Sequence, residues 1–358
     1  MVSRLQCPVC QSVFRDRWRC TCGSPLDYAE QFLPDSNIPT FEVGGPWDGL
    51  WAFEEFLPMD RHASLGEGFT PLVESVDRDI AFKLEYVSPT GSFKDRGAST
   101  VLSRAVECGV ETVLEDSSGN AGAAIATYAA RAGLDADIYV PATVKESKLR
   151  AIRRAGATPV QIEGNREDVT NACIAAVDAG AGWYASHAWN PAFLAGTATF
   201  AYEIAAQRDW SAPDAVVMPV GHGTLYLGAY RGFTALSACG WIDEMPRLYG
   251  AQAAGFAPIA SDRTDDSNET NTLADGIQIR NPVRLNQILD AVAETGGKIT
   301  AIGRDETEAA LKTLHRAGFY IEPTAAVAPA AVTALRASGD IGIDEDVVVA
   351  LSGSGLKT

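Results

Sequence analysis

The most informative segment of the chain reads Ser88-Pro89-Thr90-Gly91-Ser92-Phe93-Lys94-Asp95-Arg96-Gly97. Residues 80–87 before it alternate as a strand does, and residues 88–91 carry turn chemistry ahead of a helical pattern. Lys94 therefore falls in the first helical turn beside Phe93. The positive end of a helix and an apolar neighbour both disfavour a cationic amine, so the neutral amine that a Schiff-base lysine needs becomes more available. The alternative is a surface lysine whose stem covers Phe93.

Strand and helix patterns alternate beyond this segment. We expect strands at residues 112–114, 136–140, 158–162, 215–220 and 346–351, and helices at residues 120–132, 145–155, 167–179 and 225–238. Such alternation specifies a mainly parallel sheet covered by helices. The sequence therefore predicts an α/β architecture with two such layers.

Composition narrows the class of protein and its partners. The chain has 358 residues, of which 46% are hydrophobic and 21% charged, as expected for a globular protein of more than one domain. A net charge of −17 repels nucleic acid and anionic membranes, so neither partner is expected. The acidic excess, densest at residues 262–269, is interpreted as a solvated surface, and a high-salt habitat would account for it. Without an apolar span or a signal-peptide core, a cytoplasmic location is predicted.

Four of the seven cysteines form two close pairs near the N-terminus: Cys7, Cys10, Cys20 and Cys22. Four thiolates can surround zinc tetrahedrally and stabilise a segment too small for a core of its own. All four positions would then be filled by protein, which favours a structural over a catalytic role. Two disulfides or redox use, and free thiols, are the alternatives, and a reducing compartment argues against the disulfides.

Two further loops follow an expected strand and precede an expected helix. In the first, Ser117, Ser118, Gly119 and Asn120 could hold a carboxylate and a ring oxygen, although helix capping by Ser118 or Asn120 explains it equally simply. The second reads Gly221-His222-Gly223-Thr224, whose main-chain amides can surround a phosphate. A tight turn is the ordinary explanation of each loop taken alone.

Together the three loops resemble the fold-type II pyridoxal-phosphate enzymes, the group of tryptophan synthase β, the serine/threonine dehydratases, the cysteine synthases and the threonine synthases. The resemblance runs from about residue 66 to the C-terminus. It implies that Lys94 carries the cofactor and moves the substrate's α-proton, and that Asn120 contacts the pyridoxal 3′ oxygen. It also implies that residues 117–119 hold the substrate carboxylate and that residues 221–224 hold the cofactor phosphate, with His222 a loop residue rather than a base.

The same resemblance implies a domain plan. Two open twisted α/β/α subdomains of the tryptophan-synthase-β type are expected, a large cofactor-binding one at residues 33–97 plus 196–358 and a small mobile one at residues 98–195. Residues 1–32 are similar to the ribbon that precedes some archaeal threonine synthases. A homodimer is expected from the resemblance alone.

Within the group the chain is most similar to threonine synthases, which convert O-phospho-L-homoserine and water to L-threonine and phosphate. Its C-terminal segment, residues 351–357, resembles theirs, and Ser352 would face the pyridine nitrogen. A neutral hydroxyl there suits elimination or replacement over transamination.

One position departs from the threonine-synthase pattern. Such enzymes commonly carry Asn-Pro-x-Arg, whose Arg binds the substrate phosphate. Here the resemblance implies that Asn190 binds the substrate, but Phe193 stands three residues later in the Arg position. Substitute cations could come from Lys145, Lys148, Arg150 or Arg231. An enzyme that eliminates or replaces at the β-carbon of serine, threonine or an activated serine is therefore the alternative, followed by a catalytically silent binding protein. His187 is expected either to line the substrate cleft or to be buried with a partner.

Overall fold

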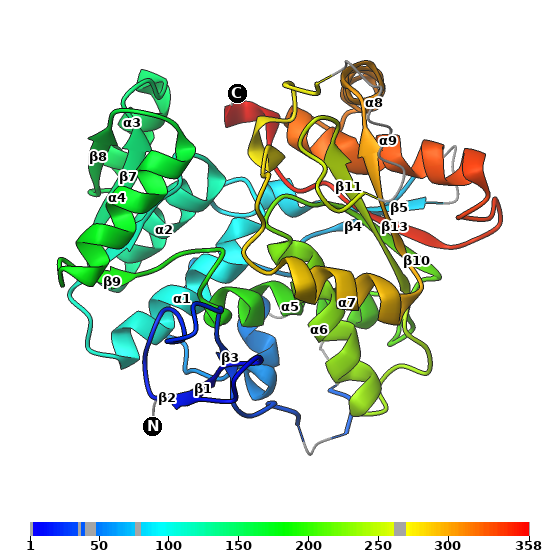
Figure 1. Ribbon diagram of the computed structural model, residues 1–358. Coiled ribbons are helices and arrows are strands. Elements are labelled where there is room, and N and C mark those ends of the chain that lie inside the picture. Colours follow the sequence, from blue (N-terminus) through cyan, green and yellow to red (C-terminus); the bar gives the residue numbers. More distant parts are fainter. Residues whose placement is uncertain (1–2, 35–36, 40–47, 76–79, 261–269, 358) are drawn as a thin grey trace. The chain divides into compact units, whose positions relative to one another are not determined.

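The computed structural model describes residues 3–34, 37–39, 48–75, 80–260 and 270–357 (Figure 1). The acidic residues 262–269 lie outside the described part. The chain divides into two compact units, of which unit 1 comprises residues 1–34, 42–67 and 94–196, and unit 2 comprises residues 35–41, 68–93 and 197–358. Among the described residues, no helix is both long and apolar enough to cross a membrane.

Unit 2 is built on a six-stranded sheet in the order β12-β11-β10-β13-β5-β4. The strands are β4 (Leu72–Glu74), β5 (Ile80–Lys83), β10 (Ala215–Pro219), β11 (Arg247–Ala253), β12 (Lys298–Ile302) and β13 (Val347–Ala350). All neighbouring strands are parallel except the β4–β5 pair. Strands β5, β10 and β13 are buried along their whole length, and β10 and β13 are continuous apolar runs, as central parallel strands usually are, whereas β5 ends in the buried Lys83.

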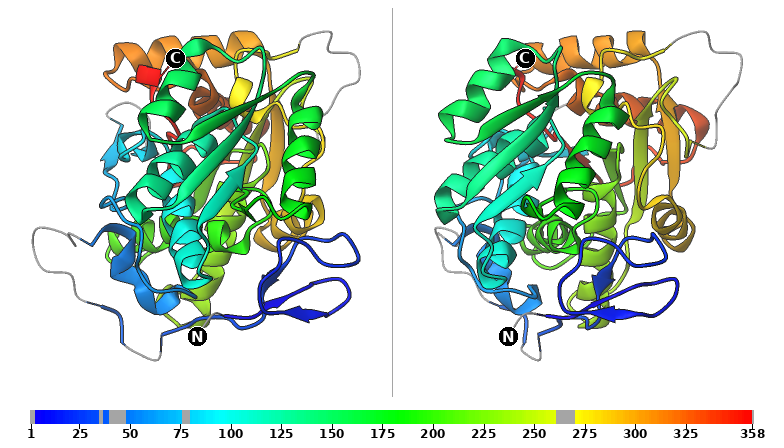
Figure 2. Two further views of the ribbon diagram at one scale, coloured as in Figure 1. Left: turned by 90° about the vertical axis from the view of Figure 1, so that its left-hand side faces the viewer. Right: turned by 60° about the vertical axis from the view of Figure 1, so that its left-hand side comes forward.

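Helices cover both faces of this sheet (Figure 2). Helices α6 (Thr224–Ala238) and α7 (Leu285–Thr295) follow β10 and precede β12, whereas α8 (Arg304–Arg316) and α9 (Pro323–Ser338) connect β12 to β13. Right-handed crossovers place these two pairs on opposite faces. The apolar side of α9 packs into the main core of the unit together with β10 and β13.

Unit 1 contains a four-stranded parallel sheet in the order β8-β7-β6-β9. Its strands are β6 (Thr112–Glu115), β7 (Asp135–Pro141), β8 (Thr158–Ile162) and β9 (Trp183–Tyr184), and its helices are α1 (Lys94–Glu107), α2 (Asn120–Ala132), α3 (Glu146–Arg154) and α4 (Arg166–Asp178). The crossovers put α2 and α3 on one face and α4 on the other. Helix α5 (Pro191–Ala206) carries the chain from unit 1 into unit 2.

The N-terminal segment of unit 1 is a small three-stranded antiparallel sheet in the order β2-β1-β3 (dark blue in Figure 1). It consists of β1 (Leu5–Gln6), β2 (Val13–Phe14) and β3 (Asp27–Tyr28), and we call residues 3–28 the ribbon. Its core holds Leu5, Cys7, Cys20 and Leu26 and little else. A cluster this small needs a further source of stability.

The predicted α/β class is confirmed, and the expected strands and helices occur with end shifts of a few residues. The strand expected at residues 80–87 is the main exception, because β5 ends at Lys83 and a 3-10 turn (Glu85–Val87) follows. The physical reason lies in Glu85, which is fully buried and accepts a 2.7 Å hydrogen bond from Thr70 Oγ1. The alternating sequence pattern did not indicate that the Glu85 carboxylate is buried in the core.

Candidate active site

Lys94 is the first residue of α1, and the chain passes from unit 2 to unit 1 directly before it. The preceding segment is fixed by the C-terminal loop that follows β13. Phe93 N–H donates to the Ser352 carbonyl at 3.1 Å, and the Ser354 N–H donates to the Gly91 carbonyl at 2.9 Å. The residue predicted to face the pyridine nitrogen thus lies beside the main chain that positions Lys94.

The aromatic ring of Phe193 lies near the Lys94 amine. Lys94 Nζ is 5.4 Å from the ring centroid, and the ring is fully buried. The ring is fixed from two directions. A Cβ at Gly97 would lie 2.4 Å from it, so only glycine fits there on α1, and Asn190 Oδ1 accepts the Ala192 N–H at the start of α5. An aromatic face attracts a cation and accepts no proton from it.

Glu115 and His187 form a buried pair in the same unit. Glu115 ends β6 and is fully buried, and its Oε1 lies 2.7 Å from His187 Nδ1 while its Oε2 accepts the His187 N–H at 3.2 Å. Burial and the charge of Asp116 raise the pKa of Glu115 well above its ordinary value, against the opposing charges of Lys94 and Arg166. The His187 ring also packs edge-on against Phe193, with centroids 6.0 Å apart.

Residues 117–120 form the turn between β6 and α2. Ser117 Oγ accepts the Gly119 N–H at 3.3 Å, and a Cβ at Gly122 would lie 1.8 Å from the Ser117 carbonyl oxygen. The N-cap residue of α2 is Gly119, with no side-chain capping bond in the structure. The capping explanation by Ser118 or Asn120 is therefore not what the geometry shows.

Residues 221–224 form the turn between β10 and α6 in unit 2. Gly223 is the N-cap residue with φ +76°, and a Cβ there would lie 2.4 Å from Ile288 Cδ1. A Cβ at Gly221 would lie 3.2 Å from Ile277. Gly223 is required by shape and Gly221 leaves little room for a side chain, and the first turn of α6 contains no acidic residue. Main-chain amides at an uncharged helix start form an anion site.

These residues fit pyridoxal phosphate. In unit 2, residues 221–224 offer main-chain amides to a phosphate group and Ser92 carries a further polar group; in unit 1, Lys94 offers an amine to an aldehyde. The Ser92 hydroxyl is fully buried two residues before Lys94 and has no hydrogen-bond partner within the described ranges. A buried hydroxyl without a hydrogen-bond partner lowers the stability of the fold, and a bound group that accepts or donates a hydrogen bond there would remove this cost.

The sequence matches the family described as "Pyridoxal-phosphate dependent enzyme" over residues 63–353. The chain belongs to this family. It is 34% identical to the threonine synthase of Methanocaldococcus jannaschii, covering 95% of this chain and 88% of the relative. It is 35% identical to that of Methanosarcina acetivorans, covering 86% and 80%. The Mycobacterium tuberculosis threonine synthase is 31% identical over 90% of this chain and 92% of its own.

Solved structures agree on the fold. The processed form of threonine deaminase isoform 2 from Solanum lycopersicum superposes with a TM-score of 0.68 at 21% identity, covering 92% of this chain and 92% of its own. The serine ammonia-lyase of Rhizomucor miehei gives a TM-score of 0.67 at 21% identity, covering 82% and 95%. The predicted fold-type II architecture is therefore confirmed.

Sequence reasoning found the three loops but missed the Glu115–His187 pair. His187 is buried with a partner, which was one of its two expected settings. Glu115 could have been noticed as a charged residue ending a strand two positions before the Ser117 turn. The candidate phosphate-binding cations lie at or on helices: Lys145 is the N-cap residue of α3, Lys148 and Arg150 lie on α3, and Arg231 lies on α6.

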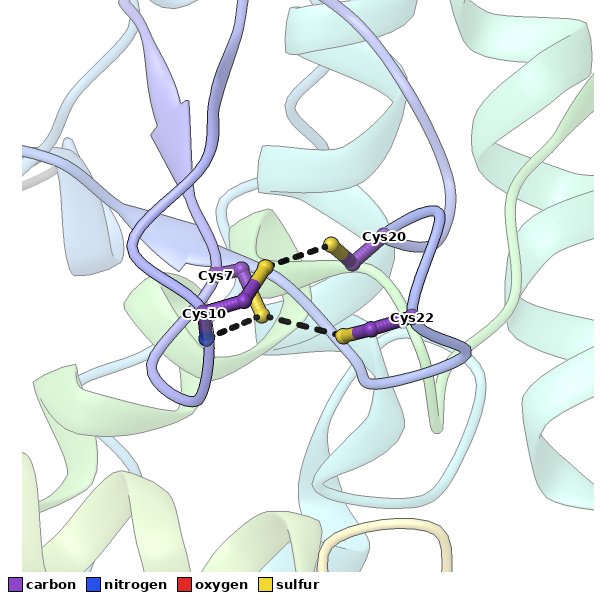
Figure 3. Close-up of side chains that lie close together, drawn as sticks. All are labelled: Cys7, Cys10, Cys20 and Cys22. Atoms are coloured by element: carbon purple, nitrogen blue, oxygen red, sulfur yellow. Dashed lines mark hydrogen bonds between the residues drawn. The ribbon is translucent and has the colours of Figure 1, made fainter.

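The four ribbon cysteines converge on one point (Figure 3). The Sγ atoms of Cys10 and Cys20 are 3.3 Å apart, and those of Cys7 and Cys22 are 3.6 Å apart. A disulfide would need about 2.05 Å. Four sulfurs at about 2.3 Å from a zinc ion lie roughly 3.8 Å from one another, so the arrangement fits a tetrahedral metal site better than two disulfides.

Proposed function

We propose that this protein is a threonine synthase, which converts O-phospho-L-homoserine and water to L-threonine and inorganic phosphate. The observation that carries the proposal is the 31–35% identity to threonine synthases over 86–95% of the chain. The geometry supports it, because an amine, a substrate turn and an anion-binding turn all occur at the starts of helices.

Each proposed role rests on the chemistry of the residue. Bound pyridoxal phosphate would supply an electron sink for negative charge at the substrate's α-carbon. Lys94 would hold the cofactor through Nζ and, once displaced by the substrate amine, would accept the α-proton at that atom. Residues 221–224 would bind the cofactor phosphate with main-chain amides, and the Ser352 hydroxyl would serve as a neutral partner for the ring nitrogen.

Unit 1 would bind and orient the substrate. The helix-start amides and hydroxyls of residues 117–119 would hold the substrate carboxylate, and Asn120 would contact the 3′ oxygen of the cofactor. Asn190 is placed at the start of α5, where its side chain fixes the turn that carries Phe193. Asn190 would therefore act on the substrate through Phe193.

The test is a substrate panel on the purified holoenzyme. We expect phosphate and threonine to appear in equal amounts from O-phospho-L-homoserine and to be absent with Lys94→Ala. A wild-type protein that binds the cofactor, shown by visible absorption, but releases no phosphate from this substrate would overturn the proposal.

A second candidate function is elimination or replacement at the β-carbon of serine, threonine or an activated serine. Phe193 favours it, because the buried ring offers no charge-assisted hydrogen bond to a phosphate dianion near Lys94. Formation of a keto acid from serine or threonine, without phosphate release from O-phospho-L-homoserine, would support this candidate. Phe193→Arg helps to separate the two candidate functions. The added guanidinium should increase phosphate release from O-phospho-L-homoserine if the protein is a threonine synthase.

We further propose that the ribbon cysteines bind structural zinc. Four ligands from protein leave no position for a substrate, so the ion would stabilise the ribbon. Elemental analysis of reduced wild-type protein should give about one zinc per chain, against much less for Cys20→Ser. Absence of zinc from the reduced wild type would remove this proposal. The homodimer, the cytoplasmic location and the division into a cofactor-binding and a mobile substrate subdomain stay predictions, of which light scattering tests the first.

A further inference from the structure

One aromatic side chain of the ribbon, Trp18, packs against two aromatic rings of unit 1 outside the ribbon. Its ring centroid lies 5.3 Å from that of Tyr184 and 5.1 Å from that of Trp189, with interplanar angles of 87° and 85°. Trp18 Nε1 also donates to Asp178 Oδ1 at 3.4 Å. Edge-to-face pairs of this kind have a defined geometry, so the position of Trp18 constrains both partners.

A second contact ties the ribbon to the helix that begins at Lys94. Arg104 of α1 is fully buried, and its guanidinium donates to the carbonyl oxygens of Ser3 and Arg15 and to the Tyr28 hydroxyl at 3.3–3.4 Å. A buried guanidinium bonded to main-chain carbonyls is costly to separate. The ribbon is therefore an integral part of unit 1.

The partners of Trp18 lead directly to the proposed substrate-binding residues. The Tyr184 hydroxyl donates to Asp116 Oδ1 at 2.9 Å, and Asp116 immediately precedes Ser117. Thr170 Oγ1 donates to the other oxygen of Asp116 at 2.6 Å, which fixes the carboxylate. On the other side, Trp189 immediately precedes Asn190, whose side chain fixes the turn before Phe193.

We propose that Trp18 is a positioning residue through which the metal-loaded ribbon orients the substrate turn at residues 117–120 and the start of α5. Trp18 lies two residues before Cys20, in the segment between the two cysteine pairs. Without the metal, the four cysteines no longer bind a common ion. We then expect the segment that contains Trp18 to be held less firmly against its partners. This inference rests on the proposed role of residues 117–120 in binding the substrate.

The experiment compares Trp18→Ala with a matched truncation in unit 2. Trp241 packs edge-on against Trp210 with centroids 5.1 Å apart at 81°, nearly the geometry of Trp18 on Trp189. For Trp18→Ala we expect the visible absorption of the bound cofactor to persist and KM for O-phospho-L-homoserine to rise about three- to tenfold, with a smaller change in kcat. Trp18→Phe should recover most of this loss. Trp241→Ala should lower Tm but leave KM unchanged.

An unchanged KM in folded, cofactor-bound Trp18→Ala would overturn the inference, as would an equal rise in KM in Trp241→Ala. The link to the metal is tested by a double-mutant cycle with Cys20→Ser. If Trp18 acts through the metal-loaded ribbon, the double variant has nearly the KM of either single variant, whereas additive effects would contradict the link. If wild-type protein does not use O-phospho-L-homoserine, the proposed function fails first. The affinity is then read from the change in visible absorption on adding L-serine or L-threonine, with the same expected pattern.

Discussion

Two lysines close together in the sequence have opposite surroundings. Lys83, at the end of β5 in unit 2, is fully buried, and its ammonium donates to Thr70 O at 2.6 Å, to Glu203 Oε2 at 2.8 Å and to Gln207 Oε1 at 2.8 Å. Lys94, at the start of α1 in unit 1, has its amine 5.4 Å from the centroid of the Phe193 ring. Lys83 is held by three hydrogen-bond acceptors from its own unit, whereas the amine of Lys94 lies near the face of an aromatic ring.

The difference matches the roles that we propose, a structural one for Lys83 and a reactive one for Lys94. An ammonium group has three donors, and all three of Lys83 are used, so the side chain is fixed in place. A lysine that binds an aldehyde must reach its neutral form, and an aromatic neighbour places the amine without taking part in the proton exchange. The comparison predicts that removing Lys94 abolishes chemistry and that removing Lys83 damages the fold.

The largest effect is expected for Lys94→Ala on activity. With no amine to carry the cofactor, turnover should fall by roughly 1000-fold or more, and the visible absorption of lysine-bound cofactor should vanish. Urea unfolding of the cofactor-free proteins should give nearly equal midpoints for wild type and variant, because the fold does not depend on this amine. If Lys94→Ala kept the absorption of lysine-bound cofactor, a lysine other than Lys94 would carry the cofactor.

The next effect is expected for Lys83→Met on stability. The substitution leaves the Glu203 carboxylate buried without its ammonium partner, which costs about 3–5 kcal/mol of unfolding free energy. The double variant Lys83→Met, Glu203→Leu should regain much of this loss, since neither charge of the pair then remains. A change below about 1 kcal/mol in the single variant, measured by urea unfolding, would contradict the structural role of Lys83.

The two lysines also show what the sequence could and could not reveal. Lys94 was identifiable because its motif is local, with a turn before it and a helix after it. The Lys83 network was not, because Glu203 and Gln207 come from α5 and the residue after it, far along the chain. The same holds for Phe193 on Gly97, which requires α5 to cross α1. The alternating strands and helices were predictable from local periodicity, whereas contacts between distant elements needed the structure.

A smaller effect is expected for Gly97→Ala, which sharpens the comparison by moving Phe193. The added methyl would lie 2.4 Å from the ring, so overpacking should cost about 1–3 kcal/mol and shift the ring beside Lys94. Gly228→Ala on α6 is the matched control, because its Cβ would lie 2.2 Å from Thr197 Oγ1 in unit 2. Both variants should lose stability, and only Gly97→Ala should change the visible spectrum of the holoenzyme. Identical spectra would show that Phe193 does not set the surroundings of Lys94.

The smallest effect concerns the buried glutamate that accompanies each lysine. Glu203 bonds Lys83 directly, whereas Glu115 bonds His187, and the charge of Lys94 only partly opposes the effect of burial on the pKa of Glu115. Burial raises the pKa of Glu115 above its ordinary 4.5, so its protonated form is favoured in the fold. Its contribution to stability is therefore complete below about pH 4.5 and is lost as pH rises through the raised pKa.

In Glu115→Gln the side chain is neutral at every pH. The unfolding free energy of the variant therefore does not fall through this group as pH rises. Relative to wild type, the variant should be less stable at about pH 5, where its bond to His187 is weakened, and the difference should shrink steadily toward about pH 9. Urea unfolding across that range measures the trend, with Glu163→Gln as the control because Glu163 is an exposed carboxylate of the same unit. A difference that stays constant with pH would mean that Glu115 is ionised in the native protein. It would then resemble Glu203, and the contrast between the two lysines would rest on Phe193 alone.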